Sequence, residues 1–275
     1  MRLLHLDSNG ELSLTKDLTN NLPRYAILSH TWGDDEDEVL FEDIVNRSAK
    51  DKVGYRKIRS FMDWTIKYGL EFAWADTCCI KKSDSSELTM LAGVGTWLGP
   101  CDTMAINSMF RWYKDARVCY VHLADVSYDR YIHDDTSDDA FQTSRWFTRG
   151  WTLQELIAPR QVVFFSSDGS YLGCKDTIQR ILVKITGIPG CALAGCDLSE
   201  FTVAERMSWA SARETKLEED RVYSLLGLFD IHLPPIYGEG SYTFMRSKLS
   251  VSPPHTPMMI LVFHGRTQYR VMRKI

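Results

Sequence analysis

Short apolar runs alternate with stretches of helical periodicity over the first 165 residues. Four apolar runs predict buried strands, at residues 25–29, 72–75, 118–123 and 161–165. Between them, apolar positions at helical spacing predict one helix from Tyr55 to Gly69 and another containing Ile106, Met109, Phe110 and Tyr113. This order of strands and helices predicts an α/β fold, with a parallel sheet flanked by helices.

Different patterns occur at the two ends of this region. Residues 1–20 predict a short hairpin at the sheet edge, with Asn9 and Gly10 as its turn. After Ser166 the pattern becomes helical, with segments at 176–185, at 220–229 and from a capping box at Thr202 and Glu205 through Arg213. We therefore expect an α/β core at residues 1–168 and a helical C-terminal extension at 169–249.

Two segments do not fit this plan. Residues 90–104 are rich in glycine and interrupt a capped helix that begins near Asp84 and Glu87. Residues 250–275 contain two adjacent prolines and match no partner element. We treat 90–104 as an atypical insertion and 250–275 as an atypical tail, which are either loops or products of gene prediction such as retained intron sequence.

Composition excludes several classes of protein. The 275 residues carry a net charge of −4 without a basic stripe, so no nucleic-acid partner is expected. No apolar run is long enough to span a bilayer, and no secretory signal is evident. Seven cysteines without a CxxC pair predict a reduced, cytoplasmic protein, and Cys191 and Cys196 alone do not predict a metal site.

The densest cluster of chemically useful side chains is SRWFTRGWTLQELIAP at residues 144–159. Two tryptophans and two arginines surround a single carboxylate, Glu155, which favours a flat or anionic ligand. Glu155 has a competing interpretation, because Thr152 and Glu155 also form a T-x-x-E capping box.

Ligands of open parallel sheets bind at the carboxyl ends of the strands. Those ends carry His30 and Trp32, then Asp76 and Thr77, then Asp125. Asp76 is equally compatible with ligand binding and with capping the next turn. A thiol nucleophile, in which His30 acts on Cys78 or Cys79, is disfavoured because cysteines at a strand end are usually packed and inert.

The acidic run at residues 34–38 predicts a solvated loop, with metal binding as the lesser alternative.

Several motifs together resemble the fungal heterokaryon incompatibility (HET) domain. They cover about residues 22–249 in the family's order: YAILSHTWG (25–33), GYRKIRSF (54–61), AWADTCCI (73–80), AINSMFRWY (105–113), residues 144–159, TVAERMSWA (202–210) and YGEG (237–240). The chain departs from the family at residues 90–104 and after the YGEG motif.

The HET domain is in turn similar to TIR domains, which have a flavodoxin-like α/β fold. The WTLQEL string parallels the TIR W-C-x-x-E-L string, whose glutamate cleaves NAD in enzymatic TIR domains, so the resemblance implies Glu155 as the catalytic residue. The substrate-binding residues expected around it are Ser29, His30, Trp32, Asp76, Arg145, Arg149 and Trp151. NAD would be a substrate, and no cofactor or metal is implied.

The resemblance implies a role in regulated cell death during non-self recognition, triggered by an unknown activating protein. Two other functional interpretations remain. In one, the domain signals by self-association without turnover, with Trp32, Trp146 and Trp151 as contact anchors. In the other, residues 90–104 prevent helix packing and the product is defective.

Overall fold

The computed structural model describes residues 1–19, 21–34, 36–81, 100–128, 139–244 and 247, together with two short strands at 260–263 and 269–272. The predicted cap at Asp84 and Glu87, and most of the two atypical segments, lie outside these residues. Within the first atypical segment, a helix begins at Pro100.

The centre of the fold is a seven-stranded mixed sheet in the order β2-β1-β4-β3-β5-β6-β7. Its strands are β1 (Leu4–Leu6), β2 (Leu12–Leu14), β3 (Tyr25–His30), β4 (Phe72–Trp74), β5 (Val118–His122), β6 (Val162–Phe165) and β7 (Tyr171–Cys174). The four predicted strands are all confirmed, and β4, β3, β5 and β6 run parallel. A further antiparallel pair, β8 (Ile260–Phe263) and β9 (Tyr269–Met272), forms a separate sheet.

The sheet is antiparallel at both edges, and only one of the two antiparallel edge pairs was predicted. The predicted N-terminal hairpin is confirmed as β1 and β2, which pair antiparallel and turn at Gly10 with a φ of +75°. At the other edge, β7 pairs antiparallel with β6, so the chain does not become helical directly after Ser166. The segment YLGC of β7 is too short, and contains too little β-branched sequence, to show a strand pattern.

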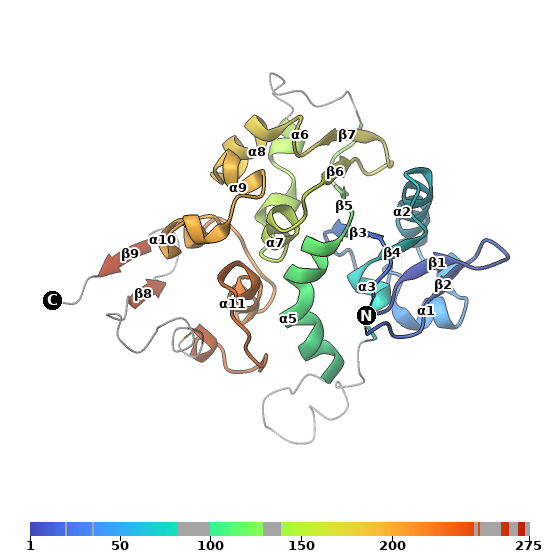
Figure 1. Ribbon diagram of the computed structural model, residues 1–275, viewed down its shortest axis with the longest axis horizontal. Helices are drawn as coiled ribbons and strands as arrows, with labels where there is room; N and C mark the ends of the chain where they lie inside the picture. Colours follow the sequence, from blue (N-terminus) through green and yellow to red (C-terminus); the bar gives the residue numbers. More distant parts are fainter. Residues whose placement is uncertain are drawn as a thin grey trace.

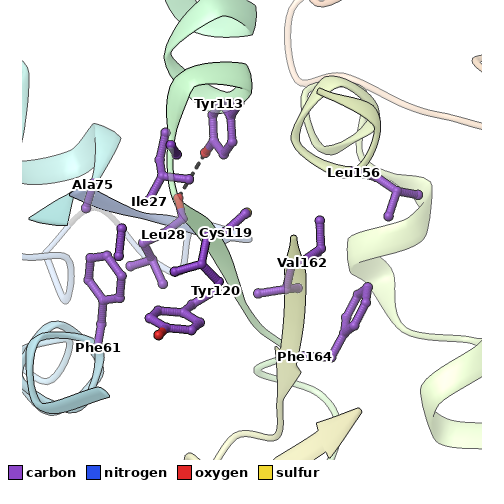
Figure 2. Close-up of a cluster of buried hydrophobic side chains, with 14 of the residues drawn as sticks. Ile27, Leu28, Phe61, Ala75, Tyr113, Cys119, Tyr120, Leu156, Val162 and Phe164 are labelled. Carbon is purple, nitrogen blue, oxygen red and sulfur yellow. Dashed lines mark hydrogen bonds between the residues drawn. The ribbon is translucent and has the colours of Figure 1, made fainter. Parts of the chain in front are cut away.

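Helices cover both faces of the sheet (Figure 1). Those of the α/β core are α1 (Phe41–Val45), η1 (Ala49–Asp51), α2 (Tyr55–Lys67), α3 (Asp76–Cys79), α5 (Pro100–Asp115), α6 (Asp139–Gln142), η2 (Arg145–Thr148) and α7 (Thr152–Ile157). Phe61 of α2 packs edge-on against Tyr120 of β5, whereas Tyr113 of α5 and Leu156 of α7 lie on the opposite face of the sheet (Figure 2).

The chain after β7 contains α8 (Gln179–Thr186), α9 (Gly190–Leu193), η3 (Leu198–Glu200), α10 (Val203–Ser208), α11 (Asp220–Tyr223) and η4 (Leu226–Phe229). The capping box at Thr202 and Glu205 is confirmed. The helix that follows it ends at Ser208 rather than Arg213, and the predicted helix at 220–229 is two short ones. These elements gather beside α7, on the side away from the N-terminal hairpin (Figure 1).

The order of the four parallel strands determines where a site can form. Across the sheet they lie in the order β4-β3-β5-β6, which is second, first, third and fourth in chain order. The connections that leave the carboxyl ends of β3 and β5 therefore run in opposite directions. Such a topological switch point is the usual ligand crevice of an open α/β sheet.

Candidate functional site

Glu155 lies against the sheet beside this switch point. It belongs to α7, all six of whose residues are buried, and its exposed fraction is 5%. The hydroxyl of Ser29, on β3, donates a hydrogen bond to Glu155 Oε2. Ser29 Oγ in turn accepts one from Trp146 Nε1 at 2.8 Å. These three buried side chains form a continuous hydrogen-bonded chain from the sheet to η2 and α7.

Strand alternation explains why Ser29 reaches Glu155. Side chains at alternate positions of a strand share a face, so Ser29 projects from the same face as Ile27, toward α5 and α7. On this face the Tyr113 hydroxyl donates to the carbonyl oxygen of Leu28 at 2.9 Å (Figure 2). The Tyr113 hydroxyl also helps to lower the pKa of the Glu155 carboxyl. The sequence pattern indicated only that Tyr113 is apolar and helical, and therefore missed this role.

The environment of Glu155 favours its neutral form. Burial raises the pKa of Glu155 to about 8, and the negative charge of Asp76 adds to this effect. The hydrogen bond from Ser29, the polar hydroxyl of Tyr113 and the charge of Arg213 oppose the rise without cancelling it. At pH 7 the carboxyl in this conformation is therefore mostly protonated.

The capping-box interpretation of Glu155 is wrong. Trp151, not Thr152, is the N-cap of α7, and no side chain caps that helix. The Thr152 hydroxyl instead lies 2.6 Å from the carbonyl oxygen of Trp146 and 2.9 Å from that of Arg149. Glu155 therefore has no helix-capping role to explain its presence.

Arg213, from the C-terminal part of the chain, supports the first turn of α7. Its Nη1 donates to the carbonyl oxygen of Arg149 and to Thr152 Oγ1, each at 2.8 Å. A backbone hydrogen bond joins the same two segments, because the amide of Gly150 donates to the carbonyl oxygen of Glu214 at 2.8 Å. Burial lowers the pKa of Arg213 to about 9, against the opposing effect of the Glu155 charge. No local pattern could have shown this pairing, which joins residues more than 60 positions apart.

A second polar group, the edge cluster, consists of His30, Glu38, Lys57, Asp76 and His122. His30 follows Ser29 in β3 and therefore lies on the opposite sheet face, toward α2. His30 Nε2 is 3.7 Å from Glu38 Oε2, and Lys57 Nζ is 2.7 Å from the same oxygen. The predicted site residues Ser29 and His30 are thus adjacent in sequence but face different layers.

Glu38 corrects the expectation that the whole acidic run is solvated. Its exposed fraction is 2%, although Asp34, Glu36 and Asp37 are exposed. Burial alone would raise the pKa of Glu38, but His30 and Lys57 outweigh burial and hold that pKa well below its usual range.

Several atoms of this edge lack hydrogen-bond partners. Asp76 Oδ2 accepts from Trp32 Nε1 at 2.8 Å, and α3 has no side-chain cap, so the proposed capping role of Asp76 is wrong. Among the described residues, the buried atoms without a hydrogen bond include His30 Nε2, Asp76 Oδ1, Thr77 Oγ1 and His122 Nδ1. Burial and the nearby charges of Lys57 and His30 lower the pKa of His122 to about 4. Buried polar atoms without a hydrogen bond are rare in folded proteins, and a functional role is one explanation for them.

Neither thiol nor metal chemistry is supported by the described residues. Cys78 and Cys79 are buried, and a hydrogen bond with Cys79, together with burial, raises the pKa of Cys78 well above its ordinary value. A protonated, inaccessible thiol is a poor nucleophile. No group of three or more His, Cys, Asp or Glu in the described part of the chain is arranged to hold a metal ion.

The remaining predicted residues have recorded contacts with groups other than Glu155. Arg145 is exposed, and its backbone amide donates to Asp125 Oδ2 at 2.7 Å. Trp151 packs against the small cluster around Tyr223, and its side chain interacts with Asp220. The charge of the half-buried Arg149 also acts on Asp220 and lowers its pKa against the effect of burial. Trp146 has an exposed fraction of 1%, so the proposal that it is a contact anchor is wrong.

Fold and site together define an α/β protein with a mixed sheet and a buried acid beside its topological switch point. Residues 25–93 match the family described as Heterokaryon incompatibility protein (HET). The chain is 51% identical over 245 residues to "Vegetative incompatibility protein HET-E-1" of Podospora anserina. These two matches support the interpretation of this chain as a heterokaryon incompatibility protein.

The match to that relative covers 87% of this chain but only 17% of the relative, so the chain spans about a sixth of its length. No solved structure matches the chain. Within the described residues, every helix is too short or too polar to cross a bilayer.

Proposed function

We propose that this chain is an effector of fungal heterokaryon incompatibility, which triggers regulated cell death after non-self recognition by an activating protein. The support is the 51% identity to a vegetative incompatibility protein over 87% of the chain. Because that relative is much longer, its other segments supply part of the whole protein's function.

The activity that we propose for the domain is TIR-like cleavage of NAD, with Glu155 as the reactive carboxyl. The observation that carries this proposal is a buried acid beside the switch point, held by the Ser29 hydroxyl and serving neither as a helix cap nor in a close ion pair. Strongly perturbed acids in such places are candidates for function. The second-first-third-fourth order of the parallel strands also agrees with the first four positions of the flavodoxin-like order.

Cleavage would break the bond between the nicotinamide nitrogen and C1′ of the ribose. The bonding electrons leave with neutral nicotinamide, and water adds at C1′ and loses a proton to solvent. Since the ribose passes through an oxocarbenium-like state, an ionised carboxylate beside it is the group that stabilises the reaction. Ser29, His30, Trp32 and Asp76 would then contact ribose hydroxyls, and Trp151, Arg145 and Arg149 the rings and phosphates.

The described conformation is a resting state on this proposal. A protonated carboxyl that is 5% exposed neither contacts NAD nor stabilises a cation. Activation must therefore expose Glu155 to water, which would also lower its pKa toward the ordinary value. Forced self-association is the simplest way to test for such an activated state.

The experiment measures nicotinamide release from NAD by the purified chain, alone and fused to an oligomerising domain. We expect release from the fused form and none from its Glu155→Gln variant, which keeps the shape of the side chain without its charge. Glu71→Gln, at an exposed position, is the matched control and should leave release unchanged. Release that persists in Glu155→Gln would disprove the assignment of this residue.

A non-catalytic signalling module is the second candidate, favoured by the inaccessibility of Glu155. On that proposal, toxicity on overexpression survives Glu155→Gln but is lost when exposed aromatic residues are replaced. Tyr68 and Tyr242, which are 57% and 72% exposed, are suitable positions for serine substitutions. Light scattering of the same variants would show whether self-association is lost together with toxicity.

A further inference from the structure

Cys191 and Cys196 are two free thiols that flank the C-terminal end of α9. Cys191 is exposed and Cys196 is half-buried, whereas Cys78, Cys79 and Cys119 are buried. Of the cysteines that the structure describes, Cys191 is the most accessible to a reagent in solution. The spacing of the pair is not that of a CxxC motif, so the sequence pattern did not indicate redox chemistry here.

The backbone at the end of α9 brings the two cysteines together. The amide of Cys196 donates to the carbonyl oxygen of Cys191 at 3.0 Å. Inside this bond, the amide of Gly195 donates to the carbonyl oxygen of Ala192 at 3.1 Å. Gly195 has a φ of +92°, in the left-handed region. These features define a Schellman motif, in which the side chains of the residues joined by the outer hydrogen bond commonly contact each other. Those residues are Cys191 and Cys196.

The electrostatics of Cys196 agree with this close approach. Burial, together with the nearby Cys191 and Glu200, raises the pKa of the Cys196 thiol. A thiol with a raised pKa is ionised less often and reacts more slowly. The exposed Cys191 is therefore the thiol that meets an oxidant first, and Cys196 is the neighbour that can complete a disulfide.

Contacts on both sides hold this turn in place. Ala192 and Leu193 of α9 are fully buried in the main core. Gln179 of α8 donates to the first carbonyl oxygen of α9 at 3.1 Å. Directly after the turn, the Asp197 side chain caps η3. Since the two thiols sit on a fixed turn, each has a high effective concentration toward the other.

We propose that Cys191 and Cys196 form a redox modification site, at which a peroxide generates a reversible disulfide. The Cys191 thiolate attacks the peroxide, breaks its O–O bond and becomes a sulfenic acid. The Cys196 thiolate then attacks Cys191 Sγ and expels hydroxide, which takes up a proton. In total the thiols lose two electrons and two protons, and hydrogen peroxide is reduced to two molecules of water. This site is independent of NAD cleavage.

The test treats the full chain with hydrogen peroxide, blocks the remaining thiols with iodoacetamide before unfolding, and analyses tryptic peptides by mass spectrometry. Residues 185–206 form one tryptic peptide, which contains no cysteine besides this pair. We expect this peptide to lose two hydrogen atoms and to escape alkylation, and we expect dithiothreitol to restore both thiols. An unmodified peptide, a sulfinic acid on Cys191 with Cys196 still open to alkylation, or a disulfide that links two chains would overturn the proposal.

Cys196→Ser distinguishes a paired thiol from a lone one. In oxidised glutathione the parent should form the disulfide without a lasting glutathione adduct, because Cys196 displaces glutathione from Cys191. In Cys196→Ser the adduct on Cys191 should persist. Cys174→Ser, which replaces a half-buried thiol outside the pair, is the matched control and should behave as the parent does. A lasting adduct on Cys191 in the parent would count against the pair.

Unfolding shows whether the turn, rather than the sequence spacing, pairs the thiols. In a glutathione buffer, the ratio of disulfide to dithiol in this peptide should be about tenfold or more higher for the folded chain than for the chain in urea. The reason is that the unfolded chain loses conformational entropy when the loop closes, whereas the folded turn has already closed it. Equal ratios in the two states would overturn the role of the Schellman motif.

Discussion

The raised pKa of Glu155 predicts that the stability of this protein falls as pH rises through neutrality. In the unfolded chain the carboxyl has a pKa near its ordinary value of 4.5, whereas in the folded chain its pKa is about 8. Between these two values the folded state holds a proton that the unfolded state has lost. The stabilising effect is therefore fully present below about pH 4.5 and is lost as pH rises to about 8.

The size of the effect follows from the shift. A difference of about 3.5 pH units at about 1.36 kcal/mol per unit gives about 5 kcal/mol between the two limits. Glu155→Gln replaces the neutral acid by a neutral amide of the same shape. The variant should be within about 1 kcal/mol of the parent at pH 5 and should gain on it by about 1.4 kcal/mol for each pH unit up to about pH 8.

Urea unfolding of both proteins at pH 5.5, 6.5, 7.5 and 8.5 measures this difference. His122, whose pKa is lowered to about 4, also makes stability depend on pH. Because both proteins contain His122, its contribution cancels in the difference between their free energies of unfolding. Glu71→Gln, at an exposed position, is the control variant and is measured alongside. A Glu155→Gln variant that loses stability relative to the parent as pH rises would refute the reasoning, because Glu155 would then be ionised and stabilised by Arg213.

Two further predictions concern a buried ion pair and a close packing contact elsewhere in the fold. Lys57→Met leaves the buried Glu38 without its closest cation and should lower the free energy of unfolding by about 3–5 kcal/mol, measured with urea. The exposed Lys16→Met is its control, and a loss below about 1 kcal/mol would contradict the buried ion pair. Gly227→Ala should cost about 1–3 kcal/mol in the same assay, because its Cβ would lie 2.1 Å from Phe110 Cβ. Gly33→Ala, where the nearest atom is 3.7 Å away, should be nearly neutral, and equal effects of the two would show that η4 does not pack on α5.

The parallel strands were predictable because each is a continuous apolar run. Strands buried on both faces, such as β3, need apolar residues at nearly every position, and this pattern is visible in a single sequence. The edge strand β7 was not predictable, since half of its residues are only partly buried and pairing with β6, not local preference, makes it a strand. The break between α11 and η4 was likewise missed, because 220–229 shows one continuous helical pattern.

The candidate site was predictable only in part. Ser29 and Glu155 were both identified, and the structure brings them into direct contact. Trp146 was noticed as part of an aromatic cluster, but its burial and its bond to Ser29 were not foreseen. Arg213 and His122 carry no local signal, because their roles depend on neighbours that come from distant parts of the chain.

By itself, the sequence determined the order of strands and helices and the presence of a single acid among tryptophans and arginines at residues 144–159. Only the tertiary structure decided which groups that acid contacts and whether it carries a charge. A T-x-x-E pattern favours a cap because the cap is made within one turn, but Ser29, 126 positions away, lies across the sheet face and takes the carboxyl instead. Burial in that layer, which no local pattern encodes, then raises the pKa of Glu155 and keeps it neutral.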